Sequence, residues 1–153
     1  VDAMLKKPGR KLAEYEMALR ADLTPTNWKA PDVWVRGIAD ILIVDDENLT
    51  AWVGDWNTGN NKYPDRDQLV LMSLMVFEHF PHIRKVNSAL LFIVKNDMVK
   101  MSMTRDQKDD YWGKYRERTA RLEASFSNDV WNPTQTPLCG WCQVTGCEFN
   151  PKH

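Results

Sequence analysis

The sequence contains no long apolar run, because charged residues interrupt the hydrophobic ones, which make up 43% of its 153 residues. A helix that crosses a membrane needs about 20 consecutive apolar residues, so the pattern predicts no membrane association. A secretory signal peptide, with a charged start followed by an apolar stretch, is also lacking. We therefore expect a cytoplasmic protein.

Cysteine is scarce and is confined to one short segment. The three cysteines all lie between Cys139 and Cys147, whereas a secreted domain held by disulfides spreads an even number of cysteines along its chain. The pattern excludes that class of protein. It indicates either a local metal site or free thiols.

A large excess of one charge is missing as well. The net charge is −1, so any binding of nucleic acid must rely on local basic patches. With 27% charged residues and no internal repeat, residues 1–153 have the composition of one soluble domain with a proper core. Because the chain starts at Val1 rather than at a methionine, we expect an N-terminal part of the full protein to be missing.

Two segments rich in β-branched residues, 33–44 and 49–56, flank a polar turn and predict an antiparallel hairpin. Each strand carries one aspartate near its middle, Asp40 in the first and Asp55 in the second. Two half-buried carboxylates about 4 Å apart repel each other by roughly 4 kcal/mol at an effective dielectric constant of about 20. Such a pair usually holds a cation, and oxygen ligands suit Mg²⁺ or Mn²⁺.

The hairpin contains two short motifs, Gly37-x-x-Asp40 and Asp55-Trp56-Asn57-Thr58-Gly59. They resemble the G-x-x-D and D-x-K-T-G motifs of the PD-(D/E)XK nuclease superfamily, and they are most similar to its RecB-like branch of phage exonucleases. Gln68 fits the Q-x-x-x-Y helix of that branch, although Met72 replaces the tyrosine, and the closing cysteines fit its C-terminal tail. The resemblance implies an α/β fold with a restriction-endonuclease-like core, in which helices flank a mixed central β-sheet of four to five strands.

The resemblance also implies a function and a site. It implies a DNA exonuclease or endonuclease that uses Mg²⁺ or Mn²⁺ and acts in phage recombination or DNA processing, in the cytoplasm of a bacterial host. Besides DNA, the partners it implies are further copies of the chain or phage recombination proteins. Asp40 and Asp55 would hold the metal ion with Glu14 and the backbone carbonyl of Trp56, and Gln68 would support the substrate or water beside it.

Asn57 departs from the family pattern, which has a catalytic lysine at this position. That lysine orients the attacking water and stabilises the negative charge that develops on the phosphate. Asparagine keeps a hydrogen-bond donor but has no charge, and losing such a contact commonly costs on the order of 10² to 10³ in rate. Three explanations fit: a substitution introduced to trap an inactive form, a charge supplied by Lys62 or Lys95, or a nuclease-fold module that binds DNA without cleaving it.

The other segments predict strands and helices around this hairpin. Residues 12–24 fit either a helix or a strand, and we favour the strand. We expect a helix over 65–80, strands over 86–95 and 98–103, and a long helix that a capping box opens at Thr104 and that ends near Phe126. The packing stripe of the long helix is predicted to be Tyr111, Tyr115, Leu122 and Phe126.

Basic side chains that are grouped locally are the candidates for contact with DNA. One group would follow a phosphate backbone from a loop and from one face of the long helix, although a solvated helix face gives the same pattern; it consists of Lys62, Lys114, Arg118 and Arg121. A second group near the start of the chain fits either DNA binding or a solvated end; it consists of Lys6, Lys7, Arg10 and Lys11.

The C-terminal segment, residues 139–153, contains Cys139, Cys142 and Cys147 with C-x₂-C-x₄-C spacing. Both thiolates of a C-x₂-C turn can bind one soft metal, but three thiolates need a fourth ligand. In relatives with a [4Fe–4S] cluster this ligand is an upstream cysteine, which here would lie in a missing N-terminal part. Alternatively, His153 completes a Zn²⁺ site, or the cysteines only pack.

Overall fold

The computed structural model describes residues 2–59 and 65–150. The chain divides into two compact units, residues 1–113 and 114–153, and each is described by itself. No helix within the described ranges has the length and apolar character that crossing a membrane requires. The prediction of one nuclease-like domain over the whole chain stays a prediction.

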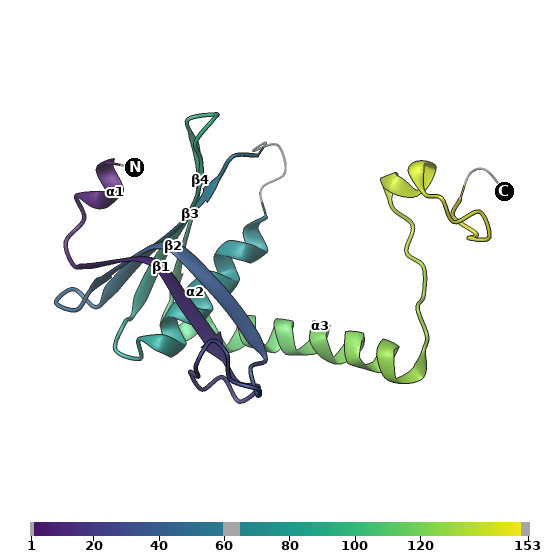
Figure 1. Ribbon diagram of the computed structural model, residues 1–153, viewed down its shortest axis with the longest axis horizontal. Coiled ribbons are helices and arrows are strands. Elements are labelled where there is room, and N and C mark those ends of the chain that lie inside the picture. Colours follow the sequence, from purple (N-terminus) through teal and green to yellow (C-terminus); the bar gives the residue numbers. More distant parts are fainter. Residues whose placement is uncertain (1, 60–64, 151–153) are drawn as a thin grey trace. The chain divides into compact units, whose positions relative to one another are not determined.

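The first unit contains a mixed sheet of five strands, counted among the described residues, with the order β1-β2-β3-β4-β5. Its elements in chain order are α1 (Asp2–Leu5), β1 (Arg10–Leu19), β2 (Val35–Asp45), β3 (Thr50–Asn57), α2 (Arg66–His79), β4 (Lys85–Phe92) and β5 (Asp97–Thr104). Only the β3–β4 pair is parallel. The predicted α/β class, with helices beside a mixed sheet, is therefore confirmed (Figure 1).

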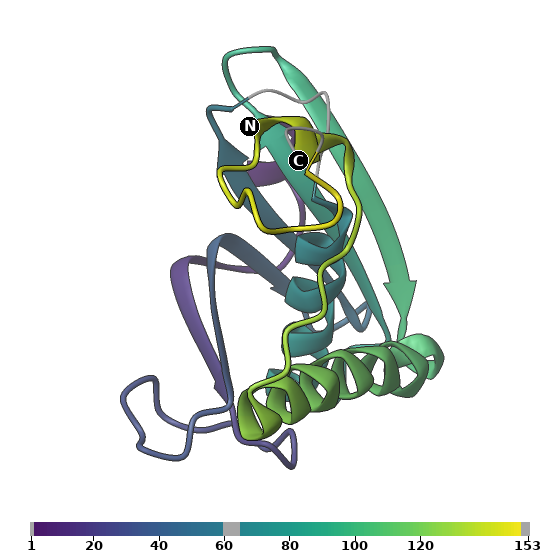
Figure 2. The ribbon, with the colours of Figure 1, turned by 90° about the vertical axis from the view of Figure 1, so that its right-hand side faces the viewer.

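Helix α2 makes the parallel pairing possible, because two parallel strands need a long crossover between them. It begins where the Asp65 side chain accepts hydrogen bonds from the backbone N–H groups of Asp67 and Gln68. Most of its side chains are buried, and its methionines lie over Gly37 of β2, whose missing Cβ leaves room for the Met75 sulfur. Figure 2 shows α2 packed inside the unit, with β4 and β5 forming a long hairpin at the edge of the sheet.

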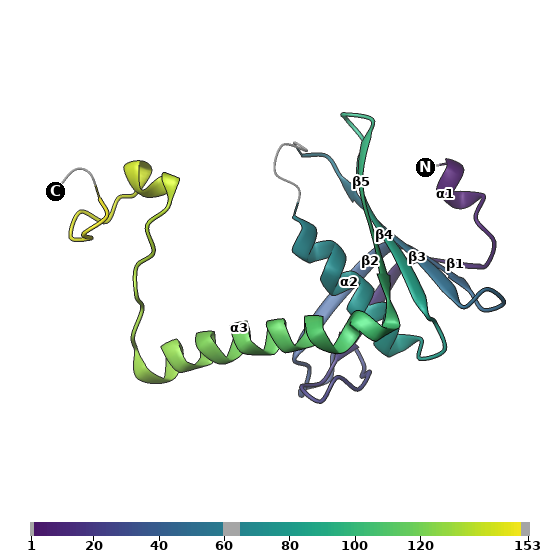
Figure 3. The same cartoon turned by 180° about the vertical axis from the view of Figure 1, so that it is seen from behind.

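The short helix α1 lies on the other side of the sheet from α2 (Figures 1 and 3). Its Met4 side chain reaches Gly54 of β3, where a Cβ atom would lie 2.9 Å from the methionine methyl group. The turn after α1 leads to Gly9, which has φ of +110° and whose Cβ would clash with the Val44 carbonyl oxygen. Only glycine lets the backbone pass so close to β2.

The strands of the first unit follow the predictions closely, with two corrections. The strand predicted over 12–24 is present as β1, but it ends at Leu19, and the hairpin at 33–56 is confirmed as β2 with β3. Strand β4 ends at Phe92, not at residue 95, because the chain turns there, and Ile93 and Val94 are 56% and 72% exposed at the hairpin tip. Their apolar character was wrongly taken as a sign of a buried strand.

The capping box at Thr104 is confirmed, since its backbone N–H donates to Gln107 Oε1 over 3.0 Å. It opens the 3₁₀ turn η1 (Arg105–Gln107), which continues as α3 (Lys108–Asn128) from the first unit into the second. The predicted packing stripe is wrong: Trp112 is the buried residue of α3, whereas Leu122 and Phe126 are 50% and 69% exposed.

Within the second unit, a short 3₁₀ helix, η2 (Pro137–Trp141), carries the first of the three cysteines. The Phe126 ring meets the Trp131 ring edge to face, with 4.7 Å between the ring centroids. These two exposed aromatic rings pack on each other because neither is covered by a larger core.

Candidate active site

Strands β2 and β3 part in the middle of the sheet. Their antiparallel pairing ends at Ile41 opposite Gly54. Beyond this point β3 stays paired only with β4, up to Asn57 opposite Phe92, while β2 stays paired only with β1. We call this place the fork, and Figure 1 shows the two strand pairs running apart.

Asp40 and Asp55 are the first residues beyond the last pair, so the register sets them directly opposite each other at the fork. Opposite residues of an antiparallel pair have Cβ atoms about 4.5–5.5 Å apart and point to the same face. Asp40 Oδ2 accepts a hydrogen bond of 2.7 Å from the backbone N–H of Trp56. A side chain of β2 thus replaces the strand-to-strand hydrogen bond that the fork removes, and it fixes the carboxylate there.

Asp55 is held from the other side by helix α2. Gln68, in the first turn of that helix, donates from Nε2 to Asp55 Oδ2 over 2.8 Å. Burial and the nearby negative charge of Asp40 raise the pKa of Asp55, whereas the Gln68 hydrogen bond opposes the rise. The two carboxylates are therefore close enough to repel each other.

Each carboxylate has one oxygen engaged by an N–H donor, and a contact between the Asp40 and Asp55 side chains also raises the pKa of Asp55. Two anionic oxygens that converge in a half-buried place fit a hard divalent cation such as Mg²⁺ or Mn²⁺. A cation bound between them would also offset the repulsion that, together with burial, raises the pKa of Asp55.

Glu14 lies in β1 between Ala13, which is opposite Ile41, and Tyr15, which is opposite Ala39. The register therefore sets Glu14 opposite Asp40, although its own pairing is interrupted and it adopts φ of +49°. Its side chain is exposed. Among the described residues, no group of three or more His, Cys, Asp and Glu side chains is arranged to hold a metal ion. The structure thus brings together the two aspartates, and the ligand roles of Glu14 and of the Trp56 carbonyl stay predictions.

Asn57 ends β3, two positions after Asp55, where the resembled family has its lysine. Its Oδ1 accepts a hydrogen bond of 2.7 Å from the backbone N–H of Gly59, and its carbonyl oxygen accepts one of 3.0 Å from Ile93 N–H. The side chain is therefore tied to its own turn. Of the lysines that were expected to replace the missing charge, Lys95 is exposed in the turn after β4, and Lys62 lies outside the described residues.

The second unit carries the basic residues predicted to contact DNA on α3. Lys114, Arg118 and Arg121 are exposed. The Arg118 guanidinium lies 5.9 Å from the centroid of the Tyr115 ring, and Arg121 pairs with Glu117 over 3.6 Å. Both basic side chains thus have local partners on the helix, and their role in DNA binding stays a prediction.

The three cysteines line one hollow of about 670 Å³ in the second unit, together with Glu148. All three are free thiols, and the Cys139 sulfur accepts a hydrogen bond of 3.3 Å from the Thr136 backbone N–H. They are not among any metal-binding group of three in the part of the chain that is described. His153, the suggested fourth ligand, lies outside that part.

Comparison with known proteins adds nothing to this geometry, since no protein-family model matches the chain and no curated protein matches it significantly.

Proposed function

We propose that this chain is a metal-dependent deoxyribonuclease domain with a PD-(D/E)XK-type core, acting as an exonuclease or endonuclease on DNA. The observation that carries the proposal is the convergence of Asp40 and Asp55 at the fork, with one oxygen of each fixed by an N–H donor. An acid pair placed where two strands part accepts one hydrogen bond at each carboxylate, but its two negative charges repel each other. It suits a divalent cation.

In this proposal the protein's side chains bind the metal ion and orient its ligands. Asp40 and Asp55 hold Mg²⁺ or Mn²⁺, with Glu14 and the Trp56 carbonyl completing the set of ligands. The bound ion would activate a water molecule and neutralise charge on the phosphate. Gln68 keeps Asp55 turned toward the ion, because its amide holds the far oxygen of that carboxylate.

We expect slow cleavage because the Asn57 amide has no charge and its oxygen already accepts a hydrogen bond from the Gly59 N–H. Asn57→Lys should restore the charge and raise Mg²⁺-dependent cleavage of a labelled linear duplex by about 10² to 10³. Asn57→Gln is the matched control, since it lengthens the side chain without adding charge, and it should give no such gain.

Metal binding itself tests the acid pair. Calorimetry with Mn²⁺ should show binding to the unchanged chain and none to Asp40→Asn. Glu47→Gln, which removes an exposed acid in the turn between β2 and β3, should bind Mn²⁺ as the unchanged chain does. Equal binding by all three proteins would rule out the fork as the metal site.

A second candidate function is a nuclease-fold module that binds DNA without cleaving it. The fixed orientation of the Asn57 amide favours it, since a site under selection for cleavage needs a free cation there. The two functions differ in one result: if Asn57→Lys binds duplex DNA and Mn²⁺ but still does not cleave, the chain is a binding module.

A further inference from the structure

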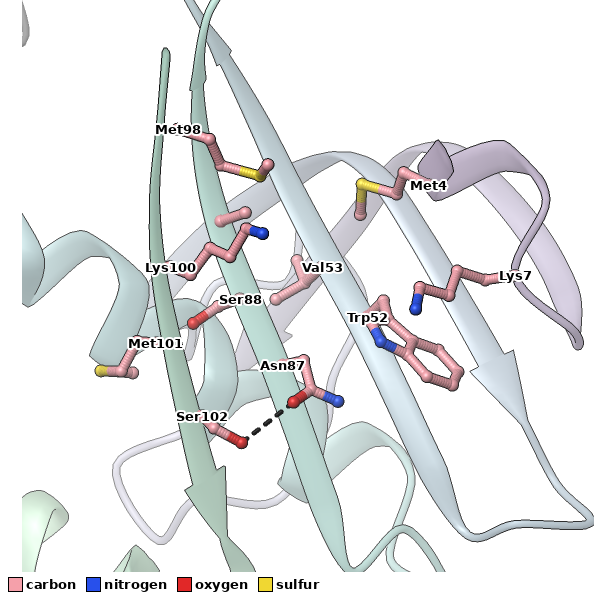
Figure 4. A pocket seen from close by; sticks show the side chains of 11 residues that line it. Met4, Lys7, Trp52, Val53, Asn87, Ser88, Met98, Lys100, Met101 and Ser102 are labelled. Carbon is pink, nitrogen blue, oxygen red and sulfur yellow. Dashed lines mark hydrogen bonds between the residues drawn. The ribbon is translucent and has the colours of Figure 1, made fainter. Parts of the chain in front are cut away.

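The sheet face opposite α2 contains a hollow of about 500 Å³, which lies between β3, β4, β5 and the N-terminal α1 with its following turn. This size is within the range of small-molecule and cofactor sites. Figure 4 shows side chains from each of these elements around it. Those used in the argument are Met4, Lys7, Trp52, Asn87, Lys100 and Ser102.

The register explains why these side chains meet. Trp52 is opposite Asn87, and Asn87 is opposite Ser102, so the three lie in one row and point to the same face. In the next row Gly54 is opposite Ala89, and Ala89 is opposite Lys100. Gly54 has no side chain and Ala89 has only a methyl group, and the Met4 side chain fills the space over Gly54.

The polar groups around the hollow are two lysines, which only donate hydrogen bonds, and Asn87, Ser88 and Ser102, which both donate and accept. Lys7 Nζ lies 5.3 Å from the centroid of a Trp52 ring, and Lys100 comes from the opposite wall. Neither lysine forms an ion pair with another residue that the structure describes. Ser102 Oγ donates to Asn87 Oδ1 over 2.9 Å, which turns the amide nitrogen of Asn87 to other partners.

No acidic residue is among the described residues that line the hollow. The site therefore combines two ammonium groups, an amide donor and an aromatic face with two serine hydroxyls, Ser88 and Ser102, and apolar side chains. A complementary ligand is negatively charged and has a flat ring with hydrogen-bond acceptors. A nucleotide has all of these features, because its phosphate is anionic and its base stacks on aromatic rings.

We propose that this hollow binds a nucleotide of a single-stranded nucleic acid, with the base stacked on Trp52 and the flanking phosphates at Lys7 and Lys100. The Asn87 amide nitrogen then donates to the edge of the base. Lys7 now lies over the ring where the base would stack, and its long exposed side chain can swing from the ring to a phosphate.

A nucleic-acid strand fits the site better than a free nucleotide does, because lysines outside the hollow extend its positive charge. Lys11 lies in the same row as Trp52, across Ile43, and Lys85 is two positions before Asn87 on the same face of β4. Both are exposed. These lysines extend the basic surface to either side, where the next phosphates of a strand would pass.

The test is fluorescence anisotropy of a labelled oligothymidine of about 15 nucleotides, close to the longer site sizes of single-strand binders, with the full chain in EDTA. Trp52→Leu keeps an apolar floor but removes the stacking ring, and it should weaken binding about tenfold or more. The double variant Lys7→Gln/Lys100→Gln should weaken binding and lower the slope of log affinity against log salt by about 1.4, or about 0.7 for each lost phosphate contact. Both lysines are exposed, so this variant should fold normally.

Lys29→Gln is the control for the loss of a surface lysine, because Lys29 is exposed in the loop between β1 and β2 and does not line the hollow. It should change neither affinity nor slope. Unchanged binding by Trp52→Leu and by the double lysine variant would overturn the proposal. So would equal competition by thymidine monophosphate, which would assign the hollow to a free nucleotide, or by a duplex, whose bases are already stacked.

A protein partner on this face would give a different result. If the chain is a dimer in light scattering and Trp52→Leu makes it a monomer without changing the affinity for the oligonucleotide, the face is an interface between copies and the proposal fails. The measurement in EDTA separates the inference from the proposed nuclease. Because EDTA removes divalent ions, the affinity measured for the oligonucleotide does not depend on whether the fork binds a metal ion.

Discussion

Replacing Asp55 by asparagine should stabilise the metal-free protein. The substituted side chain would keep the hydrogen bond from Gln68, because its amide oxygen still accepts, but it would carry no charge to repel Asp40. The pKa of Asp55 is raised in the folded protein above its ordinary value of 3.8. The folded state therefore holds this proton more tightly than the unfolded state, and Asp55 costs stability as the pH rises through its folded pKa.

The size of the gain follows from the repulsion. Two unit charges about 4 Å apart repel by roughly 4 kcal/mol at an effective dielectric constant of about 20. Asp40 and Asp55 are only half-buried, so solvent screening leaves a gain on the order of 1 kcal/mol. For a unit of this size that corresponds to a rise in Tm of about 4 °C.

Thermal unfolding followed by circular dichroism measures this gain. At about pH 7 in EDTA, where an ordinary carboxyl is ionised, Asp55→Asn should melt about 4 °C above the unchanged chain. Below pH 3.8, where the carboxyl is protonated in both the folded and the unfolded state, the difference should vanish. Glu47→Gln, in the exposed turn, is the control and should not shift Tm.

Manganese should reverse the order of stability. At a free Mn²⁺ concentration of about 100 times Kd, the unchanged chain should gain about 2.7 kcal/mol, whereas Asp55→Asn should gain little. The reasoning is refuted if Asp55→Asn melts at or below the Tm of the unchanged chain at neutral pH in EDTA. In that case the two carboxylates do not repel each other, and the fork has no electrostatic need for a cation.

Three further substitutions test which contacts stabilise the fold of the first unit. Gly9→Ala should lower stability by about 2 kcal/mol in chemical denaturation, because alanine is strained at φ of +110° and its Cβ meets the Val44 carbonyl. Arg105→Met should cost roughly 3 kcal/mol, since the guanidinium donates to three carbonyl oxygens around the end of α2; Arg84→Met, at an exposed position, is its control. Trp112→Phe should lose about 1 kcal/mol by removing the hydrogen bond of 2.8 Å to Glu78, and a loss of equal size in Trp131→Phe, an exposed tryptophan, would contradict this reason.

Local sequence patterns predicted most of the sheet, because the preferences of residues for strands, turns and helices act within one element. The β-branched runs around a polar turn indicated the hairpin of β2 and β3, and the apolar run closed by Pro81 indicated α2. The pattern failed at Ile93 and Val94, where an apolar pair stands at an exposed turn. The pattern also failed on α3. The helical spacing of Leu122 and Phe126 predicts a buried face, but the sequence does not show whether another element covers that face.

The acid pair was predicted by its motif, but the reason for its closeness was not. Spacing along the chain cannot show that the pairing of β2 and β3 stops at Gly54, because this depends on how α2 and β4 draw β3 away. The hydrogen bond from Trp56 N–H to Asp40 follows from the same parting. The Trp52 hollow was missed for a similar reason. The sequence feature that could have indicated it is Asn87, a polar residue in an apolar strand. Its role is apparent only when Trp52 and Ser102 are seen opposite it in the sheet.

The fork gives the clearest physical argument for a bound cation in the native protein. Parting two central strands removes hydrogen bonds of the ladder, and only one is replaced, by the Asp40 side chain. Placing a second carboxylate opposite the first adds repulsion, and burial together with this repulsion raises the pKa of Asp55. Both costs fall at the fork. A divalent ion held by Asp40 and Asp55, as proposed, would neutralise the pair and so offset the repulsion.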